Sequence, residues 1–249
     1  EQLTVSDMVK SIAVSSANDC ACAMAEHLAG SEGAFADKMN QRAAELGMTD
    51  SHFVNCTGLD DDDSAKEHRT SAMDIAIMSR ELLKNHPDIT KYTTIWMDTV
   101  RNGAFGLSNT NKLIRFYPGA TGLKTGFTRQ AMYCLSASAE RVGLIAVVMG
   151  CETSQKRFAA CKGLLDYGFA NYALYTPVCP EAAVPVKLGT AESVEAVPGS
   201  ETPMLIEKAR KTGMTTEVTL EESITAPVSQ GQRLGELTVR EGGEVITRI

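Results

Sequence analysis

A nine-residue stretch at positions 120–128, Ala-Thr-Gly-Leu-Lys-Thr-Gly-Phe-Thr, constrains the fold of this chain more than any other feature. It combines a lysine, three hydroxyl side chains and two glycines, and two apolar runs follow it at 132–138 and 144–149, joined by a short polar turn at 139–143. Apolar runs separated by such a turn predict a hairpin of core strands. The polar stretch before them predicts an edge strand that lines a polar site.

Helical periodicity dominates the first ninety residues. Apolar residues recur at a spacing of three and four, and the segments begin after capping residues and end at Gly or before Pro. They predict helices at 3–14, 20–29, 31–46 and 70–83, and a further helix follows the hairpin at 154–172. A helical cluster joined to an antiparallel sheet, with a terminal helix packed on that sheet, predicts an α+β or three-layer fold.

The composition of the sequence changes near Tyr175. Beyond it, short segments of alternating Val, Thr and Leu are separated by Gly and Pro, which is typical of short strands. About 75 residues of this kind suffice for a small all-β domain. We therefore expect two domains, a larger one at residues 1–174 and a small all-β one at 175–249.

Charge and hydropathy exclude two classes of partner. The net charge is −7 and the isoelectric point is near 5.2, and Lys and Arg form no block, so no nucleic-acid partner is expected. No run of about 18 apolar residues occurs, so the sequence predicts no membrane-spanning helix.

The sequence predicts no metal and no cofactor. Seven cysteines form no CxxC pair and no Cys/His spacing typical of zinc, which favours small buried side chains over a disulfide or metal site. Four consecutive acids at 60–63 lack the calcium-loop pattern and favour a solvated loop.

Chemistry is expected at Lys124, Thr125 and Gly126. The ammonium and the hydroxyl are suited to a substrate carboxylate, and a glycine lets a substrate backbone lie against the strand. Ser16 and Asn18 lie on a connection between two predicted helices, where Ser16 is suited to proton relay or nucleophilic attack and Asn18 to binding an amide carbonyl. The alternative for both residues is N-capping of the second helix.

The spacing Ser16-x-Asn18, with Lys124-Thr125-Gly126 far along the chain, matches the second and third motifs of the active-site-serine penicillin-recognising enzymes. Their surroundings resemble the low-molecular-mass D-alanyl-D-alanine carboxypeptidases, and the strand-rich tail resembles that family's C-terminal domain, so the resemblance covers nearly the whole chain. The segments that carry it are 3–30, 44–49 with 58–60, 109–113 and 122–128.

This resemblance implies an α+β, β-lactamase/transpeptidase-like domain followed by a small all-β C-terminal domain. It implies a serine enzyme in the extracytoplasmic cell envelope that removes the terminal D-alanine from peptidoglycan stem peptides ending in D-Ala-D-Ala and is acylated by β-lactam antibiotics. By the motif match, Ser16 assists proton transfer and Asn18 holds the substrate amide, while Lys124 and Thr125 bind the terminal carboxylate.

The resemblance also implies roles for three further residues. The backbone after Gly126, at Phe127, is expected to help form the oxyanion hole together with the amide of the nucleophile. Arg157, on the following helix, is a further candidate for binding the carboxylate, and a surface helix charge is the alternative.

One departure from the family pattern concerns the nucleophile. No serine is followed three residues later by lysine, so the S-x-x-K motif is absent from these 249 residues. Glu1 aligns downstream of the helix that carries this motif in the family. We therefore expect a fragment, with the signal peptide, outer sheet strands and acylating serine on a missing N-terminal segment and a membrane-surface anchor beyond Ile249.

Two other functions fit the same motifs. A β-lactamase shares the fold, but typically has Asp where Ala17 stands and lacks a β-rich appendage. A non-catalytic envelope-binding or scaffold protein would keep the cleft without the serine.

Overall fold

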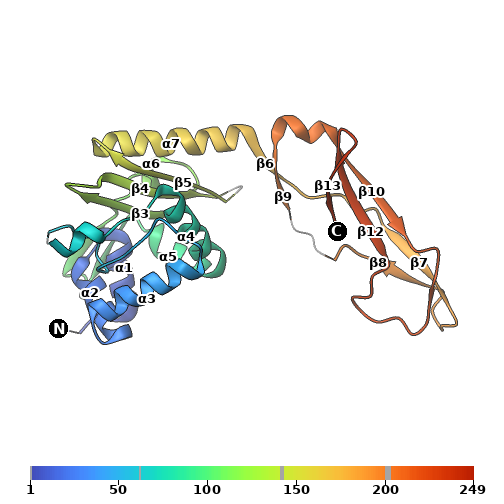
Figure 1. The fold of residues 1–249 in the computed structure, drawn as a ribbon, viewed down its shortest axis with the longest axis horizontal. Coiled ribbons are helices and arrows are strands. Elements are labelled where there is room, and N and C mark those ends of the chain that lie inside the picture. The colour runs from blue at the N-terminus through green and yellow to red at the C-terminus, as the bar shows by residue number, and fades with distance from the viewer. Residues whose placement is uncertain (1, 62, 141–142, 200–202) are drawn as a thin grey trace. The chain divides into compact units, whose positions relative to one another are not determined.

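The computed structural model of this chain describes residues 2–61, 63–140, 143–199 and 203–249. Contacts within the chain divide it into two compact units, residues 1–168 and 169–249 (Figure 1).

The first unit begins with helices that the sequence predicts closely. They are α1 (Val5–Ser15), α2 (Asn18–Ala29), α3 (Glu32–Glu45) and α4 (Ala72–Asn85). The side-chain oxygens of Thr4, Ser31 and Ser71 accept hydrogen bonds from first-turn amides, so they cap α1, α3 and α4. Gly30 ends α2 at φ 84°, a conformation that favours glycine.

Short elements lie between α3 and α4 and between α4 and the main sheet. They are η1 (Asp63–Glu67), η2 (Pro87–Ile89), α5 (Thr90–Thr93), β1 (Met97–Val100), β2 (Phe105–Ser108) and α6 (Leu113–Phe116). Strands β1 and β2 pair antiparallel, and Val100 and Leu107 from this pair form a buried cluster with Val14 of α1.

The main sheet of this unit is antiparallel, in the order β3-β4-β5, and confirms the predicted hairpin next to a polar edge strand. Its strands are β3 (Ala120–Thr128), β4 (Met132–Ala139) and β5 (Leu144–Cys151). In the turn between β4 and β5, residues 141–142 lie outside the described residues, as does Asp62 of the acidic run.

Helix α7 (Ser154–Asn171) covers one face of this sheet, and the helices of the first ninety residues lie on the other (Figure 1). The buried positions of α7 are Arg157, Cys161, Leu165 and Gly168, which recur at helical spacing. The apolar spacing of this helix predicts Leu164 on the same buried face, but Leu164 is 49% exposed and Arg157 is buried, so that part of the prediction is wrong.

The second unit consists of short strands around a small core. β6 (Tyr172–Tyr175) pairs with β9 (Met204–Glu207). β7 (Ala182–Lys187) lies between β8 (Ser193–Ala196) and β11 (Ile224–Thr225), and β12 (Gly235–Glu241) lies between β10 (Met214–Leu220) and β13 (Glu244–Arg248). A short helix, η3 (Lys208–Gly213), precedes β10. Val184, Ile224 and Val239 are buried in this unit. The predicted fold class is confirmed, an α+β domain followed by a β-rich one.

Two further observations bear on the sequence predictions. Among the described residues, no helix has both the length and the apolar character needed to cross a membrane. The expected burial of the cysteines holds for Cys20 and Cys161 and is wrong for the other five, which are half-buried.

Candidate active site

Ser16 lies at the connection between α1 and α2, as the sequence predicts. Its backbone is left-handed, at φ 59°, and its N–H donates to the Ile12 carbonyl oxygen at 3.2 Å, so it closes α1 as a C-cap. Positive φ is uncommon for a residue other than glycine and clusters at functional sites. Ala17 holds the N-cap position of α2 and makes no side-chain capping bond, so the N-capping interpretation of Ser16 and Asn18 is wrong.

Lys124 of β3 reaches back to this connection. Its Nζ donates to Ser16 Oγ at 2.7 Å and to the Thr125 carbonyl oxygen at 2.7 Å. The first bond joins residues 108 positions apart in the sequence. Asn18 is exposed at the start of α2, two positions after Ser16.

The pKa of Lys124 is lowered to about 8 by burial and by the positive charge of Arg157. Within the described residues, neither Lys124 nor Arg157 takes part in a salt bridge. Two cations near each other without a carboxylate favour an anionic ligand, and they disfavour a metal ion at this point.

Thr125 is buried, with 7% of its surface exposed. Its hydroxyl donates to Thr110 Oγ1 at 2.7 Å, and the Thr110 backbone N–H donates to the Val14 carbonyl oxygen at 3.0 Å. This chain of bonds ties the strand that carries Lys124 to the last turn of α1. These hydrogen bonds therefore help to fix the position of Lys124 on β3 relative to Ser16 at the end of α1.

Two buried asparagines hold the approach to β3 in place. Asn111 is 1% exposed, and its Nδ2 donates to the Gly122 carbonyl oxygen at 2.9 Å. Asn109 Oδ1 accepts from the Asn111 backbone N–H at 2.8 Å, and Asn109 Nδ2 donates to the Ile95 carbonyl oxygen at 2.7 Å. The Ser, Asn and Thr residues at 108–111 predict only a turn-rich segment, and the sequence assigns no role to Thr110. Burial of polar side chains is the signal that identifies them, and it is visible only in the structure.

Arg157 is a buried residue, 7% exposed, so the surface-charge alternative is wrong. One guanidinium nitrogen, NH1, donates to the Gly126 carbonyl oxygen at 3.0 Å and to the Cys134 carbonyl oxygen at 3.3 Å, and the Phe158 ring lies 4.8 Å from Cζ. Its Nε is buried without a hydrogen-bond partner among the described residues. Burial lowers the pKa of this guanidinium.

Phe127 and Gly126 form the exposed end of the edge strand. The Phe127 ring is 56% exposed and lies 4.3 Å, between centroids, from the Tyr133 ring of β4. Both residues are therefore accessible from solvent, and Arg157 of α7 holds the Gly126 carbonyl oxygen by a hydrogen bond.

Comparison with known families gives two matches. Residues 1–153 match the profile described as D-alanyl-D-alanine carboxypeptidase, and residues 176–249 match that described as penicillin-binding protein 5, C-terminal domain. Together they account for most of both units.

Individual proteins agree with these profiles. The chain is 41% identical to the D-alanyl-D-alanine carboxypeptidase DacF of Bacillus subtilis, over 99% of this chain and 64% of that protein. It is 31% identical to DacA of Escherichia coli, over 98% of this chain and 61% of that protein. The chain thus spans less than two thirds of the length of these relatives.

Solved structures are similar as well. Penicillin-binding protein 5 from Haemophilus influenzae superposes with a TM-score of 0.76 at 29% identity, covering 100% of this chain and 73% of that one. Penicillin-binding protein D2 from Listeria monocytogenes, in its ampicillin-bound form, superposes with a TM-score of 0.61 at 35% identity, covering 67% of this chain and 68% of that one.

Proposed function

Because the chain belongs to the D-alanyl-D-alanine carboxypeptidase family, we propose that the protein removes the terminal D-alanine from peptidoglycan stem peptides through an acyl-enzyme. The attacking serine comes from residues outside these 249, since no S-x-x-K occurs in them. The protein acts in the cell envelope, outside the cytoplasm, where its substrate is found.

The observation that carries this proposal is the 2.7 Å hydrogen bond from Lys124 Nζ to Ser16 Oγ. It links two polar motifs that the sequence keeps more than a hundred residues apart. A hydroxyl bonded to an ammonium is a suitable relay for the proton that must reach the leaving amine. In the proposed reaction, the serine oxygen bonds to the carbonyl carbon of the penultimate D-alanine, the C–N bond breaks, and the proton of the serine hydroxyl moves to the leaving nitrogen. Water then hydrolyses the acyl-enzyme ester and restores the serine.

Substrate recognition is assigned to the edge strand. The terminal carboxylate binds near Lys124, which has no carboxylate partner of its own in the described residues, and near the Thr125 hydroxyl. Asn18 holds the amide of the stem peptide. The peptide after Gly126, at Phe127, contributes a backbone N–H to the oxyanion hole.

Arg157 serves in this proposal as a positioning residue. Its donation to the Gly126 carbonyl oxygen orients that peptide, whose opposite side faces the substrate. Its positive charge also favours an anion beside Lys124 at a distance, without direct contact.

A fluorescent penicillin tests the proposal on the full-length protein. A stable covalent adduct is the expected result, because β-lactams acylate the same serine that attacks the stem peptide. Lys124→Gln is expected to slow acylation by on the order of 100-fold, since it removes the charge and the proton relay. The matched control is Lys84→Gln, at an exposed position on α4, which is expected to react like the parent.

Each other outcome contradicts the proposal. Rapid release of the hydrolysed label would identify a β-lactamase. Absence of labelling in the correctly folded full-length protein would favour a non-catalytic scaffold. Equal acylation rates for Lys124→Gln and Lys84→Gln would remove Lys124 from the site.

A further inference from the structure

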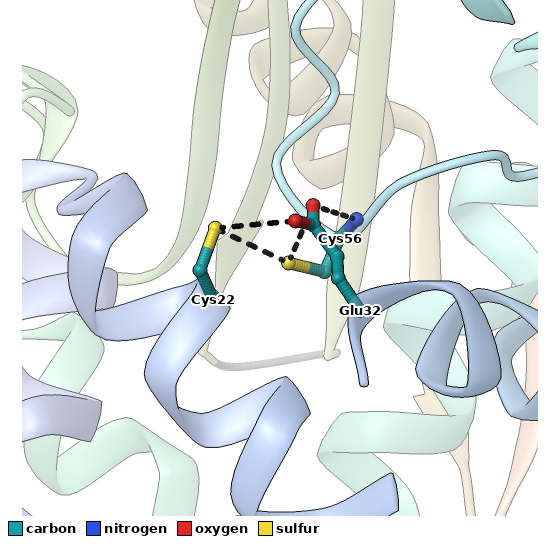
Figure 2. Close-up of side chains that lie close together, drawn as sticks. All are labelled: Cys22, Glu32 and Cys56. Carbon is teal, nitrogen blue, oxygen red and sulfur yellow. Dashed lines mark hydrogen bonds between the residues drawn. The ribbon is translucent and has the colours of Figure 1, made fainter. Parts of the chain in front are cut away.

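Three potential metal ligands meet on the helical side of the first unit, and the proposed function uses none of them. Cys22 lies on α2, Glu32 is the first residue of α3, and Cys56 lies in the loop after α3. Figure 2 shows the two sulfur atoms and the carboxylate pointing toward one another. The three side chains are half-buried, and their ligand atoms lie within 4.8 Å of one another.

The sulfur atoms and the carboxylate are spaced closely enough to share one metal ion. The two sulfur atoms lie 3.9 Å apart, Glu32 Oε1 lies 3.4 Å from Cys56 Sγ, and Glu32 Oε2 lies 3.7 Å from Cys22 Sγ. Zinc binds sulfur at about 2.3 Å and oxygen at about 2.0 Å, so tetrahedral angles place two sulfurs about 3.8 Å apart and a sulfur and an oxygen about 3.5 Å apart. The sulfur–sulfur separation and the separation of Glu32 Oε1 from Cys56 Sγ agree with this geometry within about 0.2 Å, while the oxygen measured from Cys22 is the other one of the same carboxylate.

We propose that Cys22, Glu32 and Cys56 bind a zinc ion, with water in the fourth position. Thiolates are soft ligands, and two of them with one carboxylate suit Zn²⁺ better than Mg²⁺ or Ca²⁺, which take oxygen ligands. The side chains are half-buried, so they are in part accessible to the solvent that would supply this water.

A disulfide between Cys22 and Cys56 is the competing use of the same atoms. It requires the sulfur atoms to approach to about 2.0 Å, whereas they lie 3.9 Å apart. Both uses remove the thiol hydrogens that the cysteines donate to Glu32, but a disulfide leaves the carboxylate with only the Cys56 backbone N–H, at 3.4 Å, as a donor within this cluster, whereas zinc supplies a cation in exchange for the two protons. In the described residues Glu32 takes part in no salt bridge, so a cation compensates its charge better than a disulfide does.

The zinc site would connect three segments of the helical side. Cys22 lies one helical turn after Asn18 on α2, so the ion would fix the helix that presents Asn18 against α3 and the loop that contains Cys56. This inference does not depend on the proposed reaction, and it is tested without measuring activity.

The test is titration of the full chain with Zn²⁺, after a chelator has removed metal and while a phosphine keeps every thiol reduced. We expect one zinc ion per chain with a dissociation constant on the order of micromolar or tighter. Cys22→Ser and Cys56→Ser are each expected to weaken binding by at least about 100-fold, and Glu32→Gln by about 10-fold. The matched control is Cys179→Ser, which removes a half-buried thiol of the second unit and leaves binding unchanged.

A second measurement uses only the parent chain, so it does not depend on whether the variants fold. The parent chain loaded with Co²⁺ is expected to show an intense thiolate-to-cobalt charge-transfer band and the visible bands of tetrahedral cobalt. Absence of zinc binding, a cobalt spectrum without the thiolate band, or equal binding in the folded cysteine variants would overturn the proposal. Formation of a Cys22–Cys56 disulfide at a rate that saturating Zn²⁺ leaves unchanged would overturn it too.

Discussion

At the scale of single residues, the buried charge of Lys124 in the candidate site lowers the stability of the folded chain. Its ammonium group is largely removed from water and lies near a second cation, and its hydrogen bonds to Ser16 and to a backbone oxygen compensate only in part. A folded-state pKa near 8, against 10.5 for an ordinary lysine, means that the folded chain binds this proton more weakly than the unfolded chain does. Substrate binding would reverse this, because a carboxylate supplies the missing opposite charge.

The pH dependence of stability tests this account. Between pH 8 and 10.5 the unfolded chain holds more protons at Lys124, so the free energy of unfolding gains a contribution that rises with pH across this window. Lys124→Met removes that contribution. The difference in unfolding free energy between the parent and Lys124→Met is expected to shift in favour of the parent by roughly 2 kcal/mol from pH 7.5 to pH 10. Urea unfolding at several pH values measures it, and parallel curves for the two proteins would contradict the low pKa.

At the scale of secondary-structure elements, helix α7 packs on the sheet through a glycine. A Cβ added at Gly168 would lie 2.5 Å from Leu144 Cδ1 of β5, whereas a Cβ at Gly163 of the same helix meets no atom within 4 Å. The two glycines share one helix and differ only in what lies outside them. Substitutions at these two glycines therefore allow the effect of packing on stability to be measured separately from the effect of helix propensity.

Alanine at these two glycines is expected to have opposite effects. Gly163→Ala should raise the free energy of unfolding by about 0.5–1 kcal/mol, because glycine loses more backbone entropy in a helix than alanine does. Gly168→Ala has the same favourable effect on backbone entropy, but its methyl group forces Leu144 to move. This overpacking costs about 1–3 kcal/mol, so the free energy of unfolding should fall. Urea unfolding followed by the fluorescence of Trp96, the single tryptophan, reports on the first unit. Equal stabilisation by both substitutions would show that α7 does not approach β5 this closely.

At this scale, the sequence predicts features that depend on neighbouring residues, and it does not predict contacts between segments that are far apart in the chain. Helix positions follow from apolar spacing and caps within one segment, and the hairpin follows from two neighbouring apolar runs, so both were predictable. The burial of Arg157 and the bond from Thr125 to Thr110 depend on partners contributed by other segments. The cluster of Cys22, Glu32 and Cys56 was missed for the same reason, since zinc spacing rules detect ligands paired along the chain and not ligands from three separate segments.

At the scale of the whole molecule, the chain comprises two units with separate cores. Leu165 of α7 is 1% exposed in the first unit, and Val239 of β12 is fully buried in the second. Each belongs to contacts made within its own unit. If the two cores are independent in energy as well as in space, a cavity in one should leave the stability of the other unchanged.

Matched cavity variants test this independence. Leu165→Ala is expected to lower the stability of the first unit by about 2–5 kcal/mol, and Val239→Ala that of the second by about 1–3 kcal/mol. Because Trp96 lies in the first unit, its fluorescence transition in urea should shift with Leu165→Ala and stay in place with Val239→Ala. The unfolding transition followed by far-ultraviolet circular dichroism, which reports on the secondary structure of both units, should shift with either substitution. A tryptophan transition that moves equally in both variants would mean that the two units unfold as one, because a cavity in the β-rich unit would then destabilise the residues around Lys124 as well.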